Sequence, residues 1–204
     1  MTLKPSHCVT RALAALAVAL SLVALSGCSA MQAQNPSGNY KPVNAVADSQ
    51  HQHLFLKGAD VTAYFTQGAY VQGKPEFVSR YEGVDFRFAS AQSQALFDQS
   101  PTRYLPEYGG YCANGVMFGI PWGGDADSWK MTGGKLYLFG GQGSKEAFLL
   151  DEKANIALAD KYWAEEVKGR NSFIQRTKRL ILRVPHYQSG EEQARQVAAA
   201  KSKP

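Results

Sequence analysis

The chain has 204 residues, of which 45% are hydrophobic, 11% aromatic and 19% charged, enough for one ordinary domain with a sizeable core. This composition excludes a disordered chain, a collagen-like repeat and a disulfide-stapled mini-protein. The three cysteines and four histidines do not cluster in the sequence, which argues against an iron–sulfur site or a four-cysteine zinc finger built from one chain.

Residues 1–27 predict a lipoprotein signal peptide. Two basic residues precede an apolar run over residues 12–25, which is shorter than the roughly 20 residues that a membrane-spanning helix needs. The sequence Leu25-Ser26-Gly27-Cys28 resembles the bacterial lipobox, whose cysteine is lipidated and becomes the new N-terminus. The alternative is ordinary secretory cleavage near Ser29-Ala30, with Cys28 lost or free.

A lipid on Cys28 would hold the chain on a bilayer without a spanning helix, because acyl chains contribute about 0.8 kcal/mol per buried methylene. Ser29 stands where an aspartate would, by resemblance to the bacterial sorting rule, favour retention in the inner membrane. The sequence therefore predicts an outer-membrane lipoprotein that faces the periplasm.

Removal of residues 1–27 leaves 20 basic and 17 acidic side chains, a net charge of +3. This mild charge argues against nucleic acid as a partner. Cys8 leaves with the signal peptide and Cys28 would carry lipid, so Cys112 is the one free thiol expected in an oxidising compartment. An intramolecular disulfide is then impossible.

Composition divides the rest of the chain into three segments. Residues 28–53 are rich in Ala, Gln, Asn, Ser and Pro, which predicts a flexible tether with a reach of roughly 25 to 30 Å. Residues 54–167 carry most of the aromatic side chains and predict a folded domain. Residues 168–204 form a basic C-terminal extension.

Two β-hairpins are predicted within the domain, because apolar and polar residues alternate on both sides of short turns. The first hairpin joins residues 77–81 to 84–88, and the second joins 129–131 to 135–139 across two glycines. One face of the first hairpin is expected to be buried.

Several short helices are also expected. Asp60 is the predicted N-cap of a helix over residues 58–65, and Ser90 of a helix to Gln99 that Pro101 stops. Two further helices are predicted, one that starts at Ser144 and one with a single apolar stripe of Ile156, Ala159, Trp163 and Val167.

The C-terminal extension is basic over residues 168–190, where six Lys and Arg side chains and no acid are interleaved with apolar residues. The favoured interpretation is a segment that covers the domain with solvated charges, and the alternative is a lipid-binding surface. Ser189 and Glu192 have the capping-box spacing that would open a last short helix. Residues 198–204 are expected to fray.

An ordered set of short motifs resembles the YHS domain family, and especially its exported bacterial branch, over residues 54–163. The motifs are Asp60 to Phe65, Tyr81-Glu82-Gly83, Phe86 to Ser90, the spacing Phe97-x-x-x-Pro101-x-x-Tyr104, Gly109 to Ala113, a hairpin over Trp129 to Leu138, and Asn155-Ile156.

The resemblance implies a small α+β domain with two β-hairpins and several short helices over residues 54–167. For the wider family it implies binding of soft or transition metals, copper in particular. The family's metal-binding members typically carry two cysteines, at positions comparable to 61–63 and to Ala89 of this chain. Neither cysteine is present, so the usual metal site is not expected here.

Cys112 is the central candidate for function. A thiol gains reactivity and metal affinity beside cations, amide hydrogens or a helix start, and the loop with Tyr108, Tyr111 and Asn114 could supply such surroundings or line a ligand pocket. The alternative is a small buried thiol packed as a hydrophobe.

A copper-like metal site is conceivable if His51 and His53 combine with Cys112 or Met117, since imidazole, thiolate and thioether suit that ion. In a mobile linker, a solvated histidine pair without a metal is the simpler interpretation. Asp125 and Asp127 could bind a cation or polar ligand, but an aspartate-rich turn beside core tryptophans is the favoured interpretation. His186 is expected to be an isolated residue of the tail.

Enzyme activity is not favoured, because motifs of hydrolases and nucleotide-binding enzymes are missing from the sequence. A cysteine nucleophile would also need a histidine base, and His51, His53 and His186 lie outside the predicted domain core. The sequence thus predicts a membrane-anchored binding domain for a metal ion or small ligand near Cys112. The alternatives are a thiol redox protein and a structural envelope lipoprotein.

Overall fold

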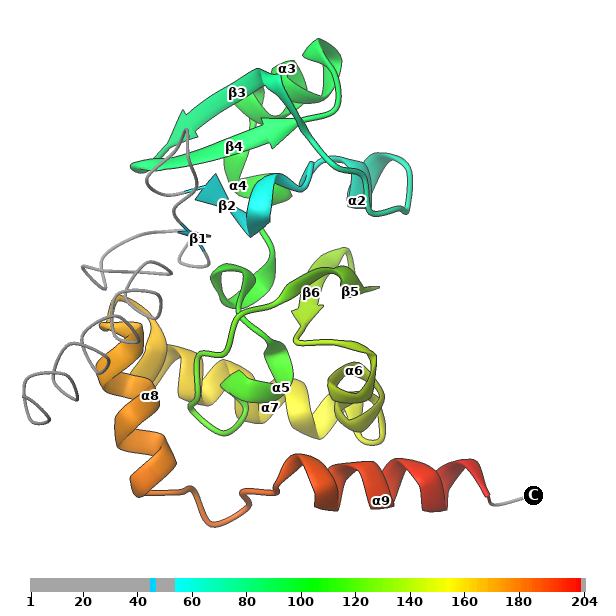
Figure 1. Ribbon diagram of the computed structural model, residues 1–204, viewed down its shortest axis with the longest axis vertical. Coiled ribbons are helices and arrows are strands. Elements are labelled where there is room, and N and C mark those ends of the chain that lie inside the picture. The colour runs from blue at the N-terminus through cyan, green and yellow to red at the C-terminus, as the bar shows by residue number, and fades with distance from the viewer. Residues whose placement is uncertain (1–44, 47–53, 203–204) are drawn as a thin grey trace, which may run out of the picture. The chain divides into compact units, whose positions relative to one another are not determined.

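The computed structural model describes residues 45–46 and 54–202 (Figure 1). The predictions for the signal peptide, for Cys28 and for the pair His51 and His53 lie outside these residues. The predicted α+β class is confirmed, because several helices pack around two small sheets. In the described part of the chain, no helix is long and apolar enough to cross a membrane.

The first sheet has the strand order β1-β2-β4-β3. Its strands are β1 (Ala45–Val46), β2 (Leu54–Phe55), β3 (Lys74–Tyr81) and β4 (Val84–Phe88). β3 and β4 form the predicted antiparallel hairpin, and β2 runs parallel to β4. Glu82 and Gly83 both adopt positive φ angles, of 46° and 82°, as a two-residue hairpin turn requires.

Aromatic stacking forms the core under this sheet. Every second residue of β4 is buried, and the Phe86 ring lies 4.8 Å from that of Phe55 and 4.6 Å from that of Phe97. Phe97 belongs to α3 (Ala91–Gln99), where the Ser90 side chain accepts a 3.1 Å hydrogen bond from the Ser93 amide. The predicted N-cap is therefore confirmed. Pro101 occupies the first turn of the next helix, α4 (Pro101–Tyr104).

Asp60 is not the helix cap that the sequence predicts. The short helix after η1 (Leu56–Gly58) is α2 (Ala63–Thr66), which starts later and has no side-chain cap. Asp60 is fully buried, and its carboxylate accepts hydrogen bonds from the Thr62 amide (2.9 Å), the Thr62 hydroxyl (2.7 Å) and the Ala89 amide (2.9 Å). A buried carboxylate needs such donors, and here they join the loop to the end of β4.

The second sheet is the other predicted hairpin, with strands β5 (Asp125–Thr132) and β6 (Lys135–Phe139). Side chains of β6 alternate between two cores. Leu136 and Leu138 pack into the core under the first sheet, whereas Tyr137 and Phe139 pack into a second core. The strand is thus shared by both halves of the fold.

Short helices surround the second core. They are η2 (Glu107–Gly110), α5 (Ala113–Val116), α6 (Gln142–Leu149), α7 (Glu152–Tyr162) and the π-helical turn η3 (Trp163–Val167). α6 begins two residues before the predicted start at Ser144. The predicted apolar stripe faces this core, since Ala159 and Val167 are buried in it and Ile156 and Trp163 pack against it.

The C-terminal segment forms two helices, α8 (Ser172–Ile181) and α9 (Gly190–Lys201). The predicted capping box is confirmed, because Ser189 and Glu192 exchange side-chain and backbone hydrogen bonds. The predicted fraying from Ala198 onward is wrong: α9 continues to Lys201, whose ammonium group lies 2.8 Å from the Glu146 carboxylate of α6.

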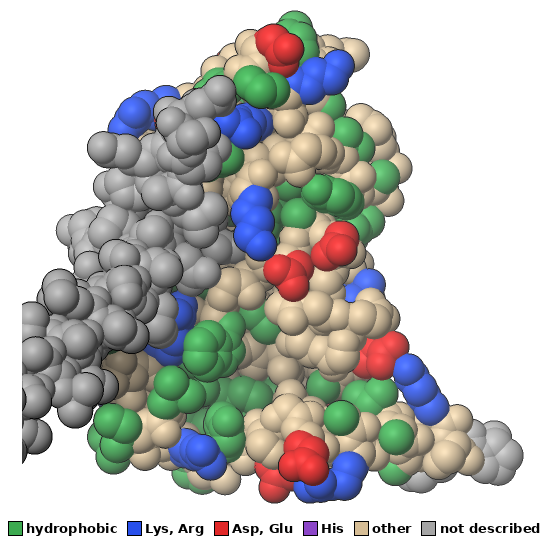
Figure 2. Space-filling model, viewed as in Figure 1, with side chains coloured by type: hydrophobic (Ala, Val, Ile, Leu, Met, Phe, Trp, Pro, Cys, Tyr) green, Lys and Arg blue, Asp and Glu red, His purple; other side chains and the backbone are tan. Residues whose placement is uncertain are grey.

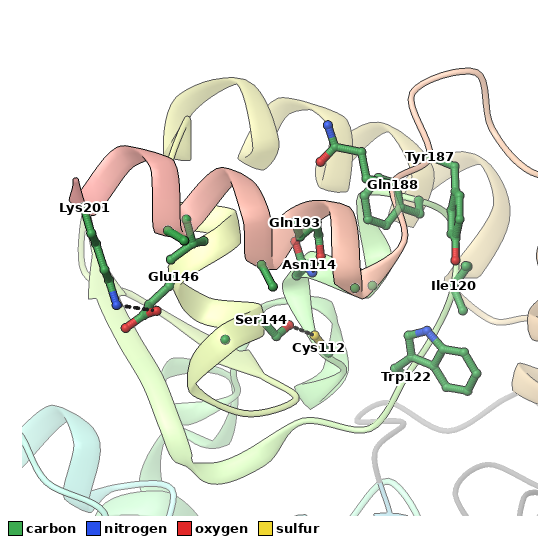
Figure 3. A pocket seen from close by; sticks show the side chains of 17 residues that line it. Cys112, Asn114, Ile120, Trp122, Ser144, Glu146, Tyr187, Gln188, Gln193 and Lys201 are labelled. Atoms are coloured by element: carbon green, nitrogen blue, oxygen red, sulfur yellow. Dashed lines mark hydrogen bonds and ion pairs between the residues drawn. The ribbon is translucent and has the colours of Figure 1, made fainter. Parts of the chain in front are cut away.

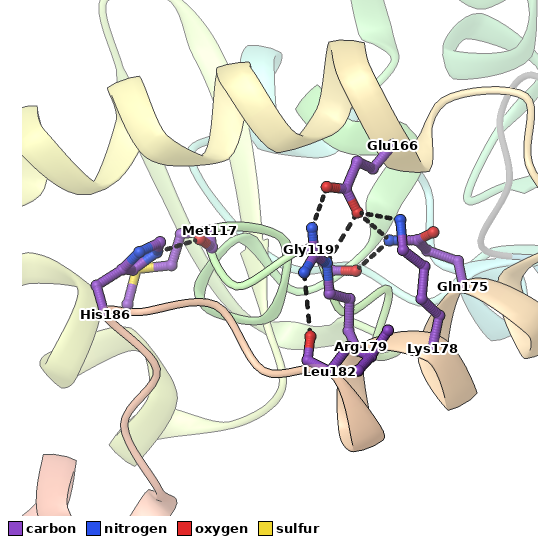
Figure 4. Close-up of polar contacts among 8 residues, drawn as sticks. All are labelled: Met117, Gly119, Glu166, Gln175, Lys178, Arg179, Leu182 and His186. Carbon is purple, nitrogen blue, oxygen red and sulfur yellow. Dashed lines mark hydrogen bonds and ion pairs between the residues drawn. The ribbon is translucent and has the colours of Figure 1, made fainter.

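Two of the six basic side chains of residues 168–190, Arg176 and Arg179, face the body of the protein, which corrects the prediction of solvated charges for these two (Figure 4 shows Arg179). Arg176 is only 4% exposed and donates a 2.8 Å hydrogen bond to the Pro121 carbonyl. Gln175 donates to the Gly119 carbonyl at 3.0 Å. Arg179 forms a bidentate ion pair with Glu166 of η3, so paired charges hold α8 in place.

The Glu166 carboxylate makes the attachment of α8 sensitive to acid. Burial raises the pKa of Glu166, but hydrogen bonds from Arg179, Gln175 and Lys178 outweigh this effect and lower the pKa to about 2. Because the pKa of Glu166 in the folded protein lies below its value of about 4.3 in the unfolded chain, the ionised carboxylate stabilises the fold above about pH 4.3. This contribution is lost as the pH falls toward 2. We expect Glu166→Gln to lower the free energy of unfolding by about 1 kcal/mol at pH 7.

Urea unfolding between pH 7 and pH 2.5 checks this expectation. The difference between wild type and Glu166→Gln should shrink below about pH 4, where the native carboxylate begins to lose its advantage. Glu165→Gln is the matched control, because Glu165 is exposed in the same turn. A difference that stays constant with pH would contradict the prediction.

Candidate functional site

A cavity of about 570 Å³ lies beside Cys112 and is bounded by α5, α6, α9 and the loop after α5 (Figure 3). We call it the Cys112 cavity. α9 runs along one side, and Cys112 and Ser144 lie on the opposite side. Its lining residues are Cys112, Asn114, Gly115, Phe118, Ile120, Trp122, Gly143, Ser144, Glu146, Tyr187, Gln188, Gly190, Gln193, Ala194, Val197, Ala198 and Lys201.

Backbone contacts place Cys112 at this wall. Tyr108, Gly109 and Gly110 adopt positive φ angles, which turn the chain sharply before Cys112. The Cys112 amide then donates to the Trp122 carbonyl at 2.8 Å, and Cys112 bridges to Leu138 of β6. The thiol is thereby fixed between the loop and the second sheet.

The Cys112 thiol is buried but has a polar neighbour. Its exposed fraction is 2%, and its Sγ atom lies 3.1 Å from the Ser144 hydroxyl oxygen in α6. Gly140 passes close by, since a Cβ atom there would lie 3.6 Å from Sγ. The thiol therefore combines the burial of a core residue with a hydrogen-bond partner and a cavity.

Tyr108 and Tyr111, predicted to contact a ligand, belong to the second core and do not line the Cys112 cavity. The Tyr108 hydroxyl donates a 2.9 Å hydrogen bond to Asp160 of α7. Burial, followed by this hydrogen bond, raises the pKa of Tyr108 well above its usual value. The two tyrosines thus anchor the loop in the second core.

Asn114 lines the cavity and ties it to α9. Its side-chain amide donates to Gln193 at 2.9 Å and accepts from Gln193 at 3.1 Å; both residues are buried. At the other end of the helix, Lys201 pairs with Glu146. Two polar ties therefore hold α9 against the cavity.

Sequence reasoning missed the contribution of α9. The signal was present, because Gln193, Ala194, Val197, Ala198 and Lys201 recur at helical spacing and all line the cavity. The capping box predicted this helix, but its partner surface lies 79 residues away along the chain at Asn114.

Of the four predicted metal ligands, only Cys112 and Met117 lie within the described residues, and the structure places them at different cavities. Met117 lines a different cavity, and its carbonyl oxygen accepts a 2.9 Å hydrogen bond from His186. His186 also packs on Phe118 and Tyr162, so it is not an isolated tail residue. Over residues 54–202, no group of three or more His, Cys, Asp or Glu side chains is placed to hold a metal ion.

Asp125 and Asp127 lie on β5, and both are exposed. Trp129, in the same strand, packs against the core under the first sheet, and its ring makes an edge contact with Tyr64 at 5.2 Å. This arrangement fits a strand whose aspartates face solvent and whose tryptophan packs inward.

The lining of the Cys112 cavity combines apolar walls with a few polar groups. Its walls are largely apolar, with Phe118, Ile120, Trp122 and Val197, and the thiol and the Ser144 hydroxyl add polar groups. None of the described residues that line it is a histidine, so a base for a cysteine nucleophile is not at hand there.

No family model, curated protein or solved structure matches this chain. The resemblance to the YHS domain family stays a prediction.

The Asn114–Gln193 pair should hold α9 in place. Gln193→Ala leaves the buried amide of Asn114 without its partner, which costs about 1 to 3 kcal/mol of unfolding free energy. A double-mutant cycle with Asn114→Ala measures the coupling. We expect the double variant to lose less stability than the sum of the single variants. Equal effects of Gln193→Ala and of Gln196→Ala, an exposed position of the same helix, would argue against this role.

Proposed function

We propose that the protein is a non-enzymatic binding domain that takes up a small ligand in the Cys112 cavity and is held at a membrane by a lipid on Cys28. The observation that carries the ligand site is the cavity itself, on whose wall a buried thiol and a hydroxyl lie 3.1 Å apart. Cavities of about 300 to 1,000 Å³ with few polar groups are typical of small-molecule sites.

The lining residues define the class of ligand. Aromatic and aliphatic side chains favour an apolar body, and the Cys112 thiol with the Ser144 hydroxyl favours one polar group at that end. Glu146 and Lys201 already neutralise each other at 2.8 Å. A small neutral molecule with a polar end therefore fits better than an ion.

Filling the cavity should abolish binding. Ala194→Phe places a ring where Ala194 lines the wall, and we expect it to weaken binding of the neutral fluorescent probe phenylnaphthylamine at least tenfold. Ala199→Phe is the matched control, since Ala199 is exposed on α9 as Ala194 is but does not line the cavity. Fluorescence titration of both full chains measures the two affinities, and equal affinities would remove the proposed site.

Two further measurements separate the alternative roles of the thiol. If Cys112 binds copper, a copper(I) titration should show uptake by the wild-type chain that Cys112→Ala lacks. Identical, negligible uptake by both chains would exclude copper binding at Cys112. For thiol redox chemistry, iodoacetamide should alkylate Cys112 faster than an ordinary thiol. Failure of the probe, copper and alkylation experiments together would leave a structural lipoprotein.

The proposed anchor rests on the lipobox-like sequence that ends at Cys28. Cys28→Ala should abolish incorporation of labelled palmitate, whereas Cys8→Ala should leave it unchanged, because Cys8 lies in the predicted signal peptide. Autoradiography of cells that express each chain makes the comparison. Palmitate on both variants would refute the assignment of Cys28. The proposed location is the periplasmic face of the outer membrane, and Ser29→Asp should shift the protein to the inner membrane.

A further inference from the structure

α8 turns its apolar side chains toward solvent. Ile174 is 66% exposed and Ile181 75%, and Leu180 and Leu182 are exposed as well. A surface helix ordinarily buries its apolar stripe and exposes its polar face. The amphipathic pattern of α8 is thus reversed with respect to the body of the protein.

The polar face of α8 is committed to the body. Ser172, Gln175, Arg176 and Arg179 occupy positions i, i+3, i+4 and i+7, so they share one side of the helix. Gln175, Arg176 and Arg179 donate hydrogen bonds to Gly119, Pro121 and Glu166, respectively. Because Ile174 and Ile181 lie on the opposite side, the helix cannot bury them without breaking these contacts.

Basic side chains surround the exposed apolar face. Residues 168–190 hold six Lys and Arg side chains and no acid, and Lys168, Arg170, Lys178 and Arg183 are exposed. Figure 2 shows hydrophobic and basic side chains gathered together at the lower left of the view, where α8 lies. Of these four basic residues, Lys178 also pairs with Glu166, at 3.1 Å.

We infer that the exposed apolar side chains of α8 and of the residue that follows it, which we call the α8 apolar face (Ile174, Leu180 and Ile181 of α8, with Leu182 directly after it), dock on an anionic phospholipid surface. An apolar helix face flanked by Lys and Arg lies in the interface of a bilayer and is attracted by anionic headgroups. A second copy of the chain is a poorer occupant, since a symmetric contact would bring like charges together.

The inference does not depend on the Cys112 cavity or on its ligand. No residue of the α8 apolar face lines that cavity. The ligand experiments can therefore fail while the lipid-docking experiment succeeds. Docking would add a second contact to the proposed lipid on Cys28, since stable anchoring usually takes two signals.

Site-specific photo-crosslinking of the full chain tests the docking. A photoreactive benzoylphenylalanine replaces Ile181 in one chain and Ala95, an exposed residue of α3, in the control chain. Each chain is mixed with vesicles of phosphatidylglycerol or of phosphatidylcholine and irradiated. We expect at least tenfold more cross-linked phosphatidylglycerol at position 181 than at position 95, and little cross-linked phosphatidylcholine at either.

Charge reversal gives the second arm. Arg170→Glu should reduce the cross-linking of phosphatidylglycerol at position 181 at least fivefold, because loss of one basic residue near a membrane removes about a fivefold preference and the new carboxylate is repelled as well. A circular dichroism melt verifies that each variant is folded. Equal cross-linking at positions 181 and 95, equal yields with the two lipids, or a protein dimer cross-linked at position 181 would overturn the inference.

Discussion

The alternation of β6 is the constraint on which the fold depends. Leu136 and Leu138 enter one core while Tyr137 and Phe139 enter the other, so a shift of one residue would exchange the two sets. Leu138 also bridges to Cys112, and the chain passes from β6 through Gly140 to Ser144 of α6. The register of this one strand thereby sets the distance between the thiol and its hydroxyl partner.

Local features of the fold were predictable from the sequence. The Ser90 cap, the Ser189 capping box and both hairpin turns involve residues that are close in the chain, so their spacing carries the information. Asp60 was misassigned for the opposite reason. Its carboxylate accepts a hydrogen bond from the amide of Ala89, 29 residues away, and no local sequence pattern predicts such a partner.

The candidate site also combines features that local sequence predicts with features that depend on residues far apart in the chain. The glycine-rich approach to Cys112 was visible in the sequence, and the structure does place Cys112 on the wall of a cavity. The sequence could not show that Tyr108 and Tyr111 turn into the core, nor that the regularly spaced face of α9 meets Asn114, 79 residues away, through Gln193. Whether Arg176 is solvated or buried was equally beyond local reasoning, because its partner Pro121 lies 55 residues away.

The late position of α9 has a consequence for Cys112. Cys112 and Ser144 belong to elements that precede α9 in the chain, and α9 lines the opposite side of the cavity beside the sulfur. Release of α9 would remove that wall and widen the access of oxidants to the Cys112 sulfur, whose oxidised forms beyond sulfenic acid do not revert unaided. The hydrogen bonds between Asn114 and Gln193, which hold α9, therefore also limit the exposure of the thiol.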